Sequence, residues 1–312
     1  MSHRPQRWRG AVEPEIWFAL LFLAARVHAI SLTNSPSADT SLMEIAPTNN
    51  NGGQAWVLSG RTQNGPRVRG LYRFDLTVLP TNALIRSATF QLNCIRQSSE
   101  TMCVTNSAFG LHRLLRSWGE GTNVAITNPG QGTPATPGGA TWLYAFYPTN
   151  AWAAPGGLVN VDFSAIESSF QFIAAPDMSP YRFESTPELV DDLQSWVRDP
   201  AANFGWILIS NLEDTICSAR RFNSREDTNS QPRLEIEFLV PPRFDLAQRS
   251  GEQFQMRFTP WPGQTYAVQF RDTLSNANWQ TLTNLGLATN SAPILFNDAL
   301  TAAQRYYRLS TY

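Results

Sequence analysis

The stretch Arg69-Gly70-Leu71-Tyr72-Arg73-Phe74-Asp75-Leu76 decides the predicted fold of this chain. Its apolar and charged residues nearly alternate, which is typical of a half-buried β-strand. A turn signal, Asn49-Asn50-Asn51-Gly52-Gly53, precedes it. Residues 233–239 alternate again and predict a closing strand. These features bracket one large β domain, which we place at residues 31–240.

Short apolar runs alternate with turn clusters through this domain, which favours an all-β sandwich of the jelly-roll type over a parallel α/β sheet. Residues 119–139 are rich in Gly, Pro, Asn and Thr and predict a long surface loop. The predicted strands are residues 55–58, 69–76, 85–96, 108–116, 158–162, 206–210 and 233–239.

One helix is predicted, and we expect it to close one end or edge of the sandwich. Thr186 can cap it, Pro187 suits its first position, and Asp199-Pro200 ends it. Its polar side contains Asp191 and Asp192, which we expect to be solvated. Its apolar face consists of Leu189, Val190, Leu193, Trp196 and Val197.

Pro241-Pro242 marks a stiff boundary before a second domain, residues 241–312. Alternation there predicts a small antiparallel sandwich. Its predicted strands are residues 253–258, 265–271, 279–285, 293–297 and 305–309.

Residues 1–29 have the pattern of a secretory signal peptide. Three arginines precede an apolar run at residues 16–25, and Val27-His28-Ala29 provides a cleavage site after Ala29. A retained membrane anchor is the alternative, but ten apolar residues are too few to span a bilayer. We therefore predict a secreted, extracellular or cell-surface protein with no membrane insertion after signal removal.

The composition argues against several classes of function. The net charge is −1, which does not favour nucleic acid. His3 and His28 lie in the predicted signal peptide, so His112 alone remains and multi-histidine metal sites are excluded. We interpret His112 as a strand residue. Because no GxSxG or similar motif is present, we predict no enzyme activity, with a polysaccharide-cleaving enzyme kept as an alternative.

Three cysteines leave the disulfide pairing open. Cys94 and Cys103 flank a polar loop between two strand-like runs, and export makes a hairpin disulfide between them our prediction. Cys217 would then be a buried free thiol. The alternative is that Cys217 pairs with one of the other two.

Two side-chain groups are candidate ligand-binding residues. Trp142, Tyr144 and Trp152 follow the long loop, and flat aromatic faces can stack on sugar rings. Core packing is the alternative, because aromatics at period two favour one buried face. The second group is Arg220, Arg221 and Arg225, whose guanidinium groups match carboxylates or sulfates bidentately. Neutralisation by Glu226 and Asp227 in a structural turn is the alternative there.

No cofactor is predicted, although structural calcium remains open. Asp39, Asp75 and Asp162, with residues 49–51, offer hard oxygen ligands. No EF-hand spacing is present, so any such site would be assembled from distant strands.

Several motifs in order resemble the DNRLRE domain, also called the disaggregatase-related domain, which is related to carbohydrate-binding module family 96. The resemblance covers residues 38–239, and no single motif in it is specific. The chain departs from the pattern in its cysteines and in the length of its 119–139 loop. The matching residues are 38–40, 49–53, 73–75, 109–113, 117–121, 140–142, 203–206 and 221–226.

This resemblance implies a secreted β jelly roll linked to acidic polysaccharides such as alginate. The tail is similar to fibronectin type III-like modules of exported bacterial proteins, through residues 263–272, 278–280 and 304–309. We therefore expect a bacterial, non-catalytic protein that binds an anionic polysaccharide. A structural or adhesive protein with extracellular protein partners is the alternative.

Overall fold

The computed structural model describes residues 29–98, 103, 106–127, 129–275, 278–299, 301 and 304–311. The predicted signal peptide lies outside these residues, apart from Ala29. The described chain divides into two compact units, with the boundary between Leu239 and Val240. Within this part of the chain, no helix has the length and apolar character needed to cross a membrane.

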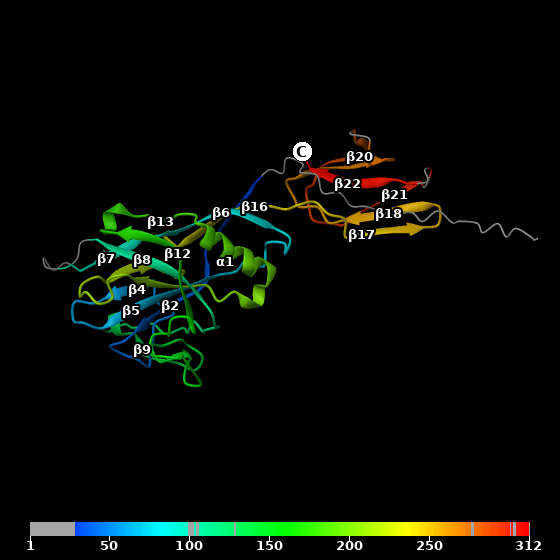
Figure 1. The fold of residues 1–312 in the computed structure, drawn as a ribbon. Helices are drawn as coiled ribbons and strands as arrows, with labels where there is room; N and C mark the ends of the chain where they lie inside the picture. The colour runs from blue at the N-terminus through cyan, green and yellow to red at the C-terminus, as the bar shows by residue number, and fades with distance from the viewer. Residues whose placement is uncertain are drawn as a thin grey trace, which may run out of the picture. The chain divides into compact units, whose positions relative to one another are not determined.

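The first unit consists of two antiparallel sheets (Figure 1). One sheet has the order β1 (Ile30–Asn34), β16 (Arg233–Leu239), β6 (Leu84–Leu92) and β13 (Tyr181–Phe183). The larger sheet has the order β12 (Phe163–Ile173), β8 (Ser107–Leu114), β14 (Trp206–Ser210), β5 (Arg67–Phe74), β4 (Trp56–Arg61), β15 (Arg220–Asn223) and β7 (Cys94–Gln97), and β2 (Pro36–Met43) also pairs with β5.

Short elements fill the connections between these strands. Two small ladders join β3 (Asn49–Asn50) to β9 (Thr133–Pro134) and β10 (Tyr144–Phe146) to β11 (Asn150–Ala151). Single 3-10 turns occur at η1 (Pro129–Gln131), η2 (Pro176–Met178) and η3 (Pro200–Ala202).

An aromatic layer joins the two sheets of the first unit. Phe90 of β6 contacts Tyr72 and Phe74 of β5, with ring centroids 5.3 and 5.4 Å apart. It also stacks on Trp206 of β14 at 6.5 Å. All four rings are buried, and each contributes about 1.5–3 kcal/mol through burial. The predicted all-β sandwich is therefore confirmed.

The predicted helix is α1 (Pro187–Arg198), the one α-helix of the described residues. The Thr186 hydroxyl accepts a hydrogen bond from the Leu189 backbone N–H at 3.0 Å, which is the predicted cap. The helix packs against β6 and β12, strands of different sheets, and so covers one side of the sandwich (Figure 1).

The predicted solvation of Asp192 is wrong, because its carboxylate faces the core. It accepts hydrogen bonds from Ser168 Oγ at 2.6 Å and Trp206 Nε1 at 2.9 Å. Arg113 lies 3.6 Å away, and burial raises the pKa of the carboxyl. The periodicity of the helix could not predict these two hydrogen bonds, because both donors come from strands. Asp191 is exposed as predicted.

The strand predicted at residues 158–162 is also wrong, because these residues form a turn. The buried Asp162 carboxylate accepts the Leu158 backbone N–H at 2.7 Å and the Ala153 N–H at 2.8 Å. Strand β12 begins only at Phe163. His112 lies on β8 as predicted, and burial lowers its pKa.

The second unit contains two three-stranded antiparallel sheets. One has the order β17 (Leu246–Ser250), β18 (Gln253–Phe258) and β21 (Ile294–Ala299). The other has the order β20 (Gln280–Leu287), β19 (Thr265–Arg271) and β22 (Tyr306–Thr311). Phe258 contacts Tyr266 across them at 5.0 Å, and Phe254 stacks on Tyr307 at 5.1 Å. These contacts make a small sandwich core.

Replacing Asp192 with Ala should destabilise the first unit by about 2–3 kcal/mol, because two buried donors lose their acceptor. Urea unfolding measures this as a lower midpoint at unchanged slope. Asp191→Ala is the matched control on the same helix and should change the midpoint little. Equal effects of the two substitutions would contradict the assigned role of Asp192.

Candidate functional site

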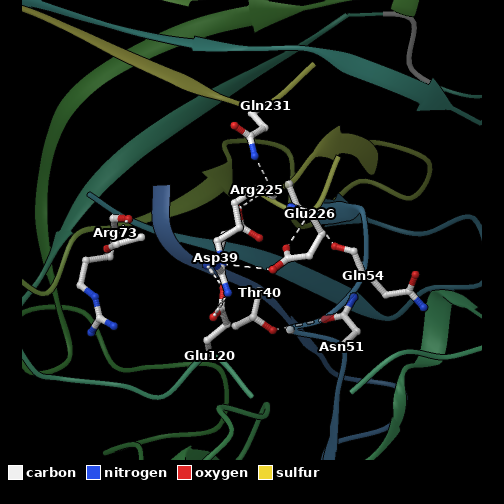
Figure 2. Close-up of polar contacts among 12 residues, drawn as sticks. Asp39, Thr40, Asn51, Gln54, Arg73, Glu120, Arg225, Glu226 and Gln231 are labelled. Atoms are coloured by element: carbon white, nitrogen blue, oxygen red, sulfur yellow. Dashed lines mark hydrogen bonds and ion pairs between the residues drawn. The ribbon is translucent and has the colours of Figure 1, made fainter. Parts of the chain in front are cut away.

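Three distant segments of the first unit meet at one polar cluster (Figure 2). Asp39 comes from β2, Glu120 follows β8, and Arg225 and Glu226 follow β15. Arg225 Nε and Nη2 donate to the two carboxylate oxygens of Glu120 at 2.6 and 2.9 Å. Glu120 Oε1 also accepts the Asp39 backbone N–H at 2.8 Å. We call Asp39, Glu120 and Glu226 the acidic cluster.

The turn at residues 49–53 packs directly against the segment that carries Glu120. Asn50 Nδ2 donates to the carbonyl oxygens of Glu120 and Ala140, both at 2.8 Å, and Asn50 Oδ1 accepts the Gly52 N–H at 2.9 Å. A Cβ at Gly52 would lie 2.1 Å from the Glu120 carbonyl oxygen. Glycine is therefore required there for the close approach of the two backbones.

The acidic cluster is only partly neutralised. Arg225 Nε lies 3.1 Å from Glu226 Oε1, and the Arg225 backbone N–H donates to Asp39 Oδ2 at 2.7 Å. Asp39 is 1% exposed, and its Oδ1 has no hydrogen-bond partner among the described residues. Burial, and then the charges of Glu226 and Glu120, raise the pKa of Asp39 well above its ordinary value, against the bond from Arg225. Burial likewise raises the pKa of Glu226.

A pocket of about 440 Å³ opens beside Arg73, and we call it the Arg73 pocket. The Arg73 guanidinium carbon lies 5.2 Å from the ring centroid of Trp118, which supports it by a cation–π contact. Burial lowers the pKa of Arg73, yet an arginine stays charged in proteins. The lining residues are Ser37, Arg73, Phe74, Asp75, Leu76, Thr77, Ser117, Pro200, Ala201, Asn203 and Phe204.

No carboxylate lies within ion-pair distance of Arg73 among the described residues, and its Nη1 donates to the Trp118 carbonyl oxygen at 3.5 Å. Asp75, on the same pocket, accepts the backbone N–H and the hydroxyl of Thr77 at 2.9 and 2.7 Å. These bonds lower the pKa of Asp75, so it is ionised at neutral pH. The pocket thus carries one cation and one separate anion.

The predicted aromatic platform requires correction at two positions. Trp142 and Trp152 are 3% and 6% exposed and belong to the core of the first unit. The Trp152 indole N–H donates to the Thr141 carbonyl oxygen at 2.9 Å. These faces are covered and cannot stack on a sugar. Tyr144 is half-buried on β10, and its ring meets Tyr147 edge-on at 5.4 Å.

The three predicted arginines do not form one binding surface. Arg220 is 1% exposed and donates to backbone carbonyl oxygens of Ala174 and Ser218, both at 3.2 Å, so its predicted ligand contact is wrong. Arg221 lies over the Trp56 ring at 4.2 Å. Arg225 is occupied by its pairs with Glu120 and Glu226. The alternative interpretation expected the Glu226 pair, whereas Asp227 instead accepts a hydrogen bond from Asn223.

The oxygen ligands proposed for calcium are not brought together. Asp75 lies in the Arg73 pocket, and the buried Asp162 is satisfied by two backbone N–H groups and by Arg116 at 3.1 Å. Asp39 instead joins Glu120 and Glu226, whose ligand atoms all lie within 4.8 Å of one another. Sequence reasoning missed Glu120 and Arg73 as site residues, although both lie in the motifs of the resemblance.

The predicted Cys94–Cys103 disulfide is wrong. Cys103 is bonded to Cys217, with their Cα atoms 4.8 Å apart. Cys94 is the free cysteine and is buried at the start of β7. Closeness in sequence suggested the hairpin pair, whereas the fold brings Cys217 to Cys103 from 114 residues away.

Comparison with known proteins finds no matching family model and no matching curated protein. The resemblance to the DNRLRE domain therefore stays a prediction.

The cysteine arrangement predicts selective alkylation. Burial raises the pKa of Cys94 to about 11, so its thiol stays protonated at pH 8 and should react with iodoacetamide only after unfolding. Peptide mass mapping without reduction should recover one disulfide-linked peptide pair, containing Cys103 and Cys217. Rapid labelling of Cys94 in the native chain, or a linked pair containing Cys94, would contradict this arrangement.

Proposed function

We propose that this chain is an exported, non-catalytic protein that binds acidic polysaccharides in the Arg73 pocket. The observation that carries the proposal is a half-buried arginine that lines a pocket and has no carboxylate within ion-pair distance among the described residues. A partly desolvated cation with no carboxylate in ion-pair contact is unfavourable, and an anionic ligand would supply that contact. By contrast, Arg225 of the same unit is paired with two carboxylates, those of Glu120 and Glu226.

The chemistry of the pocket matches a uronate unit. A guanidinium binds a carboxylate through two parallel hydrogen bonds. Asp75 can accept hydrogen bonds from sugar hydroxyls, and it disfavours a second carboxylate on its own side. Leu76, Pro200 and Phe204 provide apolar contacts for the C–H face of a ring. The volume of about 440 Å³ falls within the range of small-ligand pockets, about 300–1,000 Å³.

Two sequence features support the proposal. The predicted signal peptide would deliver the chain to the compartment in which matrix and cell-wall polysaccharides occur. The DNRLRE-like motifs include Arg73-Phe74-Asp75 and residues 203–206, and of these the first three, Asn203 and Phe204 line this pocket. The second unit then serves as a spacer or interaction module.

Substituting Arg73 with Gln should remove the positive charge of the pocket. Binding to alginate or pectate should weaken about 10- to 100-fold, because the charge-assisted hydrogen bonds to the ligand carboxylate are lost. Affinity electrophoresis of residues 30–312 through gels containing alginate, pectate or a neutral glucan measures the retardation. Arg73→Lys should restore part of the affinity, because the charge returns without the bidentate geometry.

Arg86→Gln is the matched control, since it removes one exposed arginine of the same unit. It should leave retardation unchanged. Equal losses of affinity in Arg73→Gln and Arg86→Gln would show that only net charge matters. That result would contradict binding in the Arg73 pocket. No retardation of the unsubstituted chain by any acidic glycan would overturn the function itself and favour the adhesive alternative.

A further inference from the structure

The acidic cluster gathers more negative charge than its neighbours neutralise. Asp39, Glu120 and Glu226 bring three carboxylates to one place from three segments, and Figure 2 shows them grouped around the Arg225 side chain. Arg225 is the one cation within ion-pair distance of them among the described residues. With all three ionised, two negative charges remain without a counter-charge.

An orphaned oxygen points to a missing ligand at this cluster. Asp39 is 1% exposed, and its Oδ1 accepts no hydrogen bond from the described residues, whereas Oδ2 accepts the Arg225 backbone N–H at 2.7 Å. A buried carboxylate oxygen without a partner is strongly unfavourable. Asp39 offers one of the three ligand atoms that lie within 4.8 Å of one another. A cation bound to Asp39 through Oδ1 would satisfy the orphaned oxygen and offset the excess negative charge of the cluster together.

The spacing of the ligand atoms is compatible with a calcium ion. Two oxygens bound to one Ca²⁺ at about 2.3–2.6 Å can be as far apart as about 4.6–5.2 Å. For Mg²⁺, with bonds of about 2.0–2.1 Å, the limit is about 4.2 Å, and octahedral geometry is demanded. Carboxylate oxygens that all lie within 4.8 Å of one another are close enough to share one Ca²⁺.

The carboxylates are also held in place by neighbouring groups. Ser224 Oγ lies 3.0 Å from Glu226 Oε2 and accepts the Glu226 backbone N–H at 3.1 Å. Asn50 fixes the backbone at Glu120. Preorganised ligands lose little freedom on binding, which favours a specific site over diffuse attraction.

We propose that Asp39, Glu120 and Glu226 bind one calcium ion, with water completing its coordination. The ion would join β2, the segment after β8 and the turn after β15, and so stabilise the first unit. This inference does not depend on glycan binding at the Arg73 pocket.

Calorimetric titration of chelator-treated residues 30–312 with CaCl₂ tests the site without any glycan. One bound ion per chain is expected. Calcium at about 100 times its dissociation constant should raise the melting temperature of the first unit by about 5–10 °C. Magnesium at the same concentration should give a smaller shift.

Asp39→Asn and Glu226→Gln should each lower calcium affinity at least tenfold. Asp39→Asn in EGTA should melt no lower than the unsubstituted chain, because the amide is neutral and its oxygen can still accept the Arg225 backbone N–H. Loss of calcium binding is therefore separable from misfolding. Glu237→Gln, an exposed acid on β16, is the control and should bind calcium normally. Absence of a calcium response in the unsubstituted chain, an unchanged affinity in both variants, or an equal shift by magnesium would overturn the proposal.

Discussion

The bidentate pair between Arg225 and Glu120 is the interaction on which the polar cluster of the first unit depends. Two charge-assisted hydrogen bonds join a turn after β15 to a segment after β8, and Glu120 adds a third bond to the backbone of β2. Trp118, which supports Arg73, lies two residues before Glu120. The acidic cluster and the Arg73 pocket are therefore positioned by the same short segment.

Local sequence patterns predict which residues form strands and helices better than they predict which segments contact one another. The alternation at residues 69–76 marks most of β5, and the cap at Thr186 marks the start of α1. Strand β2, residues 36–43, was not predicted, because its small and polar side chains give no apolar alternation. The roles of Asp192, Cys217 and Glu120 all depend on contacts between segments far apart in the chain. Sequence periodicity contains no information about such contacts.

The candidate site shows the same limit. Residue type predicts arginine as a candidate binding side chain, and every basic residue of this chain is arginine. Its position could not be predicted, because several arginines stack on tryptophan in the same manner: Arg73 on Trp118, Arg221 on Trp56 and Arg116 on Trp152. Arg73 differs from the other two because it lines a pocket and has no carboxylate within ion-pair distance among the described residues. Both are properties of the folded chain.

The bond between Cys103 and Cys217 encloses the segment that contains the 119–139 loop, Glu120 and α1. A protease that cut the backbone once anywhere inside this segment would leave both fragments covalently joined. The parts of the acidic cluster would also stay on one covalent molecule, since Asp39 and Glu226 lie on opposite sides of the enclosed segment. In the oxidising compartment proposed for this chain, where thiol reductants are scarce, a nicked chain would remain a single particle with its acidic cluster assembled.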